Sequence, residues 1–289
     1  MKRLLSIFLM LLLAFGGSCA AQEMDERVDE VFRSMETVGG AFVVAQHGEI
    51  VYERYYGIQQ KTTRVPVTEK TYFKCASVTK LVTGIGLMKM MDEGLLDPDE
   101  DISTYLGYTV RNRSFMDTPI TLRILMSHTA GLVENASFSR QSSRLSEMID
   151  VNQKAGANFK KDVRPGSEYV YSNFGAGITG SIIESVTGMD VSSYMRKTVF
   201  APLGIDAAYS ASQISEPEYI AALYNKDGSL YAAPSYMLRQ QYTQEARPDW
   251  HYRKTIGSLL IRPRDLARLG IALCGDGTVD GFRVLSEEA

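Results

Sequence analysis

Ser77 and Lys80 form the first pair of side chains in this sequence that could do chemistry together. If the helix expected over residues 79–91 starts beside Ser77, Lys80 lies one turn further on and on the same face. The helix dipole then favours negative charge developing on Ser77, and a lysine amine held neutral could take its proton. The alternative is a helix cap followed by a solvated lysine, because so short a pattern also arises by chance.

A second candidate group, Tyr171-Ser172-Asn173, follows Pro165-Gly166 and precedes the glycine-rich start of a helix. A phenol can relay a proton when a nearby cation lowers its pKa, and an amide side chain can hold both a lysine and a substrate. The structural alternative is a loop tyrosine that packs its ring, with Asn173 capping the next helix. Each motif occurs once, and no other nucleophile–base pattern competes. Together they favour a hydrolase that uses serine without histidine.

The strands and helices that would position these residues are indicated by hydrophobic patterns. Residues 41–45 and 50–56 are apolar, β-rich runs on either side of a turn, which predicts a hairpin. An amphipathic helix is expected before it at 24–35. Two further helices are expected at 79–91 and, with a proline near its start, at 263–274.

The middle of the chain carries few strand signals. We expect a helical insertion over about residues 100–200, and residues 205–250 are expected to form long surface loops. The sequence therefore predicts an α/β (α+β) protein with an antiparallel sheet, flanking helices and an inserted all-α region. The helices expected within the insertion cover residues 120–126, 145–151, 178–186 and 191–200.

Residues 73–80 resemble the nucleophile motif of the serine β-lactamase-related family. This family covers class C β-lactamases, D-alanyl-D-alanine peptidases and β-lactamase-like esterases. Residues 125–132 are similar to the family's Leu-Leu-Ser-His-Thr-Ser-Gly-Leu segment, and residues 165–175 to its segment that begins Pro-Gly and contains Tyr-Ser-Asn. Agreement in the family's order extends from about residue 25 to the end of the chain, and three more segments fit: 182–188, 200–205 and 263–268.

The resemblance implies a β-lactamase/transpeptidase-like fold and an acyl-enzyme mechanism. Ser77 would be the acylated nucleophile, Lys80 its base and Tyr171 a proton relay, and Asn173 would contact substrate and lysine. The substrate would be a β-lactam, a peptide ending in D-alanyl-D-alanine or an ester. No metal or organic cofactor is implied. The family uses the histidine at this position for no chemical step, so we expect the His128 side chain to have a structural role and to hydrogen-bond the backbone around Gly131.

The family's third motif, Lys-Thr-Gly or His-x-Gly on a late strand, is not found in this sequence. Residues 254–257, Lys-Thr-Ile-Gly, come close but precede a segment that in relatives lies well upstream of that motif. We therefore expect a chain truncated at its C-terminus, with the C-terminal sheet strands missing. Such a chain would have an unpaired hairpin edge and weak activity. The alternative is a non-catalytic cell-envelope binding protein with a degenerate β-lactamase-like fold.

Composition argues against nucleic-acid binding and against a zinc site. The 289 residues are 45% hydrophobic and 22% charged, with a net charge of -3, which fits a globular protein and shows no basic footprint for nucleic acid. Neither the three histidines nor the three cysteines have the spacing of a zinc site. We expect a monomer that acts on a small molecule or a peptide.

The N-terminus has the pattern of an export signal. Two basic residues precede an apolar run over residues 4–15, followed by small residues, and the run is shorter than the roughly 20 residues that a membrane span needs. Residues 1–21 are therefore expected to be a signal peptide before a domain at 22–289, and Cys19 is a candidate for lipidation and membrane attachment. The protein would be secreted or periplasmic. Whether Cys75 and Cys274 then pair is left open.

Overall fold

The computed structural model describes residues 18–135, 138, 144–153, 158–240 and 244–287. Residues 1–17 of the expected signal peptide and the side chain of Cys19 lie outside the described part. Within the described part, no helix has both the length and the hydropathy needed to cross a bilayer.

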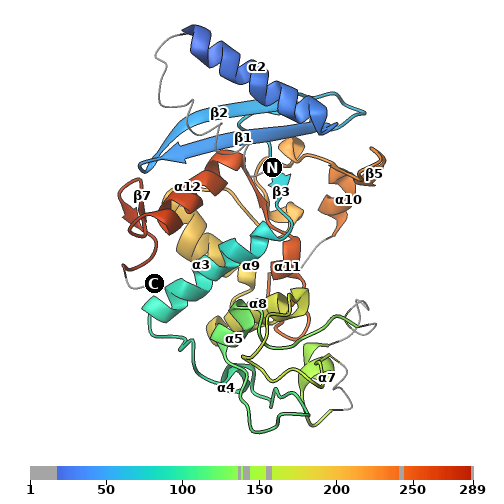
Figure 1. The fold of residues 1–289 in the computed structure, drawn as a ribbon, viewed down its shortest axis with the longest axis vertical. Helices are drawn as coiled ribbons and strands as arrows, with labels where there is room; N and C mark the ends of the chain where they lie inside the picture. Colours follow the sequence, from blue (N-terminus) through green and yellow to red (C-terminus); the bar gives the residue numbers. More distant parts are fainter. Residues whose placement is uncertain (1–17, 136–137, 139–143, 154–157, 241–243, 288–289) are drawn as a thin grey trace.

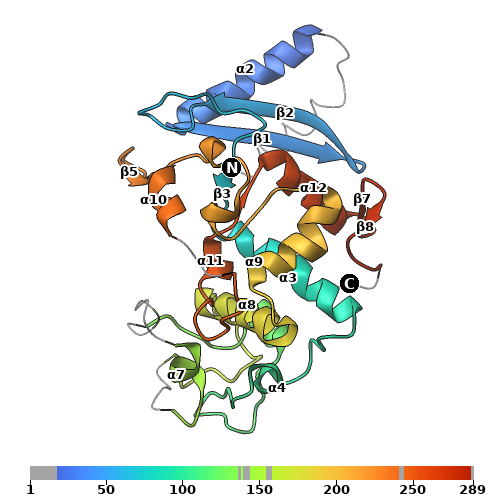
Figure 2. The ribbon, with the colours of Figure 1, turned by 180° about the vertical axis from the view of Figure 1, so that it is seen from behind.

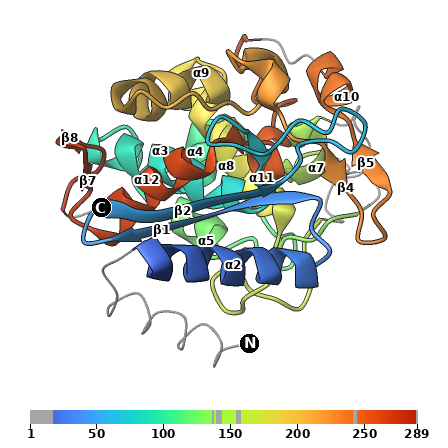
Figure 3. The same cartoon turned by 90° about the horizontal axis from the view of Figure 1, so that it is seen from above.

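The predicted hairpin is confirmed and forms one layer of the molecule. Strands β1 (Gly39–Gln46) and β2 (Glu49–Gly57) pair antiparallel in a two-stranded sheet. Helix α2 (Ser18–Ser34) lies along one face of the hairpin, and α12 (Pro263–Cys274) packs on the other face (Figures 1 and 3). Helix α12 has the bounds predicted from the sequence, whereas α2 begins six residues before the predicted start at Met24.

Two long helices occupy the centre of the fold. Helix α3 (Val78–Asp92) matches the predicted helix to within one residue at each end, and it contacts α8 (Asn173–Thr187). Both lie between the hairpin layer and the short helices at the other end of the molecule (Figure 2). Helix α8 begins five residues before the predicted 178, because the Ser172 hydroxyl caps it by accepting the Gly175 N–H. Most residues of both helices are buried, which is typical of helices at the centre of a core.

Short helices dominate the described residues between 100 and 200, as the sequence predicts. The predicted 191–200 helix is split by a change in hydrogen bonding, because its second half is a π-helix. These elements are α4 (Ile102–Leu106), α5 (Leu122–Met126), α7 (Leu145–Ile149), α9 (Val191–Met195) and the π-helix Arg196–Phe200.

The region expected as loops, 205–250, contains more regular structure than predicted. It carries a small hairpin, one α-helix and two 3₁₀ turns, and two further strand pairs lie outside it. The strand pairs are β3 (Phe73–Lys74) with β6 (Leu260–Ile261), β4 (Leu223–Tyr224) with β5 (Leu230–Ala232), and β7 (Thr278–Val279) with β8 (Phe282–Arg283). The remaining helices are 3₁₀ turns Ala201–Leu203, Ala211–Gln213 and Pro217–Tyr219, with α10 (Pro234–Arg239) and α11 (Lys254–Gly257).

The two cysteines whose side chains are described do not pair with each other. Cys75 is partly buried and Cys274 is exposed, and both are free thiols. Burial raises the pKa of Cys75 to about 11, so this thiol is protonated and inert at neutral pH.

Candidate active site

Ser77 is the N-cap residue of α3, but its hydroxyl makes no capping hydrogen bond. The hydroxyl lies instead 2.9 Å from the Tyr171 phenol oxygen and accepts a hydrogen bond from Lys80 Nζ at 3.2 Å. The residue before it, Ala76, has a left-handed φ of 43°, which is strained for a residue with a Cβ and turns the chain sharply into the helix. The serine hydroxyl thus contacts other reactive groups, Lys80 and Tyr171, and does not cap the helix.

Lys80 is held by contacts from two directions. Its ammonium donates to the Ile256 carbonyl at 2.7 Å as well as to Ser77. It also lies 5.4 Å from the centre of the Tyr171 ring, within cation–π range. These contacts hold the lysine over the serine, contrary to the alternative of a solvated side chain.

Tyr171 meets Ser77 across 94 positions of sequence. Its pKa lies below the ordinary value of 10, chiefly because of the hydrogen bond with Ser77 and further because of the hydrogen bond and positive charge of Lys80. Partial burial and the charge of Glu134 act in the opposite direction. A phenol with a lowered pKa beside a serine hydroxyl is suited to accept or relay that hydroxyl's proton.

Helix α11 supplies the carbonyl that holds Lys80, and close packing on α8 fixes its position. A Cβ on Gly177 would lie 2.4 Å from the Tyr252 carbonyl oxygen, and a Cβ on Gly180 would lie 2.6 Å from Thr255. The Thr255 hydroxyl then donates to the Ala176 carbonyl at 2.8 Å. The two glycines therefore let α11 approach α8 closely enough to present its backbone at the site.

The Lys-Thr-Ile-Gly segment is this helix, not a late strand. Lys254 and Thr255 are buried, and Lys254 forms ion pairs with Asp190 at 3.5 Å and Glu184 at 3.9 Å. The segment reaches the site through the Ile256 carbonyl rather than through the side chains that resemble the family's third motif.

Asn173 is not brought to Lys80. In the described part of the chain, the Lys80 ammonium interacts with Ser77, Ile256 and Tyr171, and no hydrogen bond joins it to Asn173. Asn173 is the first residue of α8, and its backbone N–H donates to Glu134 Oε1 at 2.6 Å. The alternative that Asn173 caps this helix is also wrong, because the cap is Ser172.

His128 hydrogen-bonds backbone as expected, but its partner differs from the prediction. Its Nδ1 accepts the Ser172 N–H at 3.3 Å rather than a group around Gly131. Its ring centre lies 4.7 Å from that of Tyr171. Sequence reasoning missed Ile256 altogether, since a backbone carbonyl carries no signal in the residue type, and it missed Glu134, a carboxylate in a loop.

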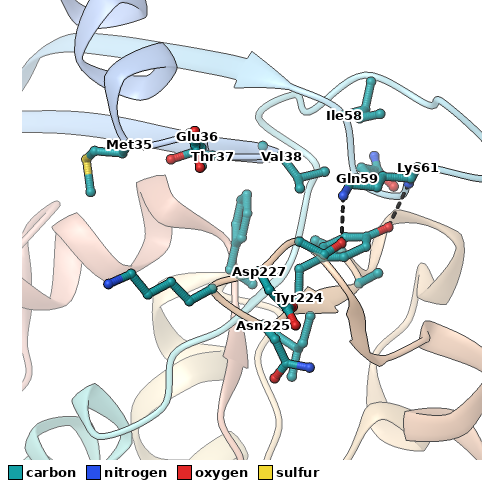
Figure 4. A pocket seen from close by; sticks show the side chains of 17 residues that line it. Met35, Glu36, Thr37, Val38, Ile58, Gln59, Lys61, Tyr224, Asn225 and Asp227 are labelled. Carbon is teal, nitrogen blue, oxygen red and sulfur yellow. Dashed lines mark hydrogen bonds between the residues drawn. The ribbon is translucent and has the colours of Figure 1, made fainter.

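A cavity of about 390 Å³ opens beside the constellation. Ser77, Lys80, His128 and Tyr171 line its reactive end, and the rest of the lining is mostly apolar: Leu81, Leu87, Met88, Leu125, Met126 and Leu273. A larger cavity of about 600 Å³ lies elsewhere, between the α2–β1 junction and the β4–β5 hairpin (Figure 4). Its lining includes charged groups such as Lys61 and Asp227 but no serine or cysteine, so the smaller cavity is the candidate active site. No cluster of three or more potential metal ligands occurs among the described residues.

Several known proteins are similar to this chain in sequence or in fold. Esterase EstB of Burkholderia gladioli is 28% identical over 225 residues, which cover 73% of this chain and 56% of the esterase. Protein flp of Staphylococcus aureus strain N315 is 22% identical over 208 residues, covering 72% of this chain and 42% of that protein. The solved structure of EstCE1, a hydrolase with promiscuous acyltransferase activity, has a TM-score of 0.70 at 22% identity and covers 94% of this chain and 76% of EstCE1.

The chain thus spans about half the length of these two curated relatives. The likeness to EstCE1 shows the β-lactamase/transpeptidase-like fold. The sequence profile of the Beta-lactamase family matches residues 24–288, which is nearly the whole chain. The chain belongs to the Beta-lactamase family.

Proposed function

We propose that this chain is a serine hydrolase that works through an acyl-enzyme on Ser77. The observation that carries the proposal is the position of the Ser77 hydroxyl within hydrogen-bond distance of both Lys80 Nζ and the Tyr171 phenol. A hydroxyl is a weak nucleophile unless a neighbouring base accepts its proton. Here the base function is divided between an amine and a phenol of lowered pKa.

In the first half-reaction the Ser77 oxygen attacks the substrate carbonyl carbon, and its proton passes to the Tyr171–Lys80 pair. The tetrahedral intermediate then expels the leaving group, which takes up that proton, and the acyl group stays on Ser77. In the second half-reaction water attacks the ester and gives its proton to the same pair. The carboxylic acid departs, and the serine regains its hydrogen.

The oxyanion of the intermediate needs hydrogen-bond donors. The Ser77 backbone N–H has no acceptor among the described residues and lies at the N-terminus of α3, where the helix dipole favours negative charge. We assign the first donor to this N–H. Asn173, two positions after Tyr171 and partly exposed, remains the proposed contact for the substrate.

An ester with a small apolar acyl group is the substrate class we favour. Away from its reactive end, the cavity beside Ser77 is lined mostly by leucine and methionine side chains, which suit an apolar acyl group. The similarity of this chain to an esterase also favours an ester substrate. β-Lactams and peptides ending in D-alanyl-D-alanine also carry a carbonyl group that a serine can attack. They are the alternative substrates in the experiment described next.

The test compares the wild type with Ser77→Ala and with Ser34→Ala, a control at an exposed serine of α2. Each protein is given p-nitrophenyl acetate, a fluorescent penicillin and a D-alanyl-D-alanine peptide, and acylation is followed by intact mass. We expect turnover and an acyl adduct in the wild type and in Ser34→Ala but not in Ser77→Ala. Binding of the penicillin that persists in Ser77→Ala, without turnover in the wild type, would instead support the non-catalytic binding protein.

Export of the chain is a separate proposal that rests on the basic, apolar and small residues before residue 22. Fractionation of cells that express the full chain should place the protein outside the cytoplasm, and its mature mass should lack residues before the cleavage site. Comparison with Cys19→Ser decides whether a lipid is attached at Cys19, since the variant would lose both the lipid mass and the membrane association.

A further inference from the structure

His128 holds the segment that carries Tyr171 through four separate contacts. Its backbone carbonyl accepts the Val170 N–H at 2.7 Å, and its Nδ1 accepts the Ser172 N–H at 3.3 Å. Its ring lies 4.7 Å from the ring of Tyr171 at a tilt of 43°, and 6.0 Å from that of Tyr169 edge-on. One residue thus fixes the backbone before and after Tyr171 as well as the tyrosine ring itself.

The backbone of His128 is shaped to make these contacts. Its N–H donates to the carbonyl of Leu125, in the last turn of α5. Its φ of 57° lies in the left-handed region. Few residues adopt this conformation without cost, and histidine and asparagine are among those enriched there. The turn directs the imidazole at the Tyr171 segment and not along α5.

We infer that His128 is a positioning residue for the proposed hydrolysis, whose neutral imidazole holds the Tyr171 phenol at Ser77 and whose protonation releases it. The inference rests on the proposed function of Ser77 but concerns a residue that does not itself touch the reacting atoms. It implies that protonation of His128 at low pH lowers the activity of the site.

The hydrogen-bond chemistry gives the reason. Nδ1 accepts the Ser172 N–H, so the proton of the neutral ring is on Nε2. A second proton on Nδ1 would turn this acceptor into a donor that faces another donor. The titratable groups that face the ring are Lys80 from α3 and Tyr169 and Tyr171 from the segment it packs on.

Charge and burial oppose protonation of the ring at neutral pH. Burial is the main cause that lowers the pKa of His128 below its ordinary value of 6.5, and the positive charge of Lys80 lowers it further. Glu134, in the loop that follows His128, accepts the Asn173 N–H. Because the folded site disfavours the protonated imidazole, its contacts persist above the lowered pKa and are lost as the pH falls through it.

Two variants distinguish the role of His128 as a hydrogen-bond acceptor from the effect of its protonation. His128→Asn keeps an acceptor oxygen near the position of Nδ1 and tolerates the left-handed backbone, but it does not titrate. His128→Gly keeps the backbone freedom and removes both acceptor and ring. His47→Asn is the matched control, since His47 is exposed in the β1–β2 turn with a φ of 52°.

The readout is kcat and KM for p-nitrophenyl acetate between about pH 5 and 9. We expect His128→Gly to lose roughly 10- to 100-fold in kcat with little change in KM, because the phenol is misplaced. We expect His128→Asn to stay within about threefold of the wild type above pH 7. Below about pH 6.5 its rate should fall less steeply than that of the wild type, because only the titration of Tyr171 remains. An acid fall in His128→Asn that matches the wild type would overturn the inference.

NMR of the imidazole nitrogens provides a readout that needs no turnover. The inference requires an unprotonated Nδ1 on His128 at neutral pH, and a Ser172 amide signal that shifts as the ring is protonated. A protonated Nδ1 at neutral pH contradicts it. Hydrolysis that is equally fast in Ser77→Ala would overturn the proposed function alone, and the NMR measurement would still decide the role of His128.

Discussion

The Ile256 carbonyl oxygen accepts a hydrogen bond from Lys80 Nζ at 2.7 Å, although the two residues are 176 positions apart. This contact aims the lysine at Ser77, so the position of α11 decides the geometry of the site. Two residues before Ile256, the side chain of Lys254 enters a buried cluster of charges that includes Glu184, Asp190 and His251. The cluster ties α11 to α8 and to the N-cap of α9.

Replacing Lys254 with methionine should destabilise the protein strongly. The lysine is 1% exposed and forms ion pairs with Asp190 and Glu184. Removal of one partner leaves a buried negative charge uncompensated, which typically costs about 3–5 kcal/mol. The free energy of unfolding of Lys254→Met, measured in urea, should fall by roughly this amount.

The control for this change is Lys226→Met at an exposed lysine between β4 and β5. Its free energy of unfolding should stay within about 0.5 kcal/mol of the wild type. Equal unfolding midpoints for Lys254→Met and the wild type would contradict a structural role for the cluster.

Replacing Lys80 with methionine should abolish acylation without unfolding the protein. The variant keeps the aliphatic stem but loses the ammonium that contacts Ser77 and Ile256. Loss of a general base typically lowers the rate about 10²–10⁴-fold. Stopped-flow measurement of p-nitrophenol release would show the loss. Lys89→Met near the other end of α3 should acylate at the wild-type rate, and a normal rate in Lys80→Met would remove the lysine from the mechanism.

Several elements could be predicted from local sequence alone. The helix at 79–91 and the helix at 263–274 were within a residue of the observed α3 and α12, because hydrophobic periodicity and flanking glycine or proline specify them locally. The start of α8 was predicted five residues late, since its glycine-rich first turn has weak helix propensity and is stabilised by the Ser172 cap and by packing.

The site was predictable only where residue types carry the signal. Ser77 and Lys80 share one helical turn, so their contact follows from spacing, whereas the approach of Tyr171 was inferred from a family resemblance. The Ile256 carbonyl has no such signal. The similarity of residues 254–257 to a strand motif was misleading, because these residues form α11 and the Lys254 side chain pairs with buried carboxylates.

Replacing Tyr171 with phenylalanine should lower kcat and change its pH dependence. The ring and its contact with His128 remain, but the hydroxyl 2.9 Å from Ser77 is lost. Because the pKa of Tyr171 lies below 10, the wild-type rate should rise with pH and level off below pH 10 as the phenol ionises. Tyr171→Phe should lack this rise and lose about 10²–10⁴-fold in kcat.

Tyr169→Phe is the control for this prediction, since Tyr169 is 65% exposed and contacts His128 only through its ring. It should keep the wild-type pH profile. If Tyr171→Phe also keeps the alkaline rise, the titrating group is another residue, and the phenol is not the proton acceptor.

Replacing Gly177 with alanine should push α11 away from α8 and so weaken both the fold and the site. The added Cβ would lie 2.4 Å from the Tyr252 carbonyl oxygen, a backbone atom in the turn that leads directly into α11. Overpacking of this kind typically costs about 1–3 kcal/mol. Gly270→Ala in α12 makes the opposite change, since nothing lies within 4 Å of its Cβ, and it should stabilise the helix by about 0.5–1 kcal/mol. Urea unfolding of the two variants should therefore shift in opposite directions, and kcat should fall only in Gly177→Ala, because only there does the Ile256 carbonyl lose its position over Lys80.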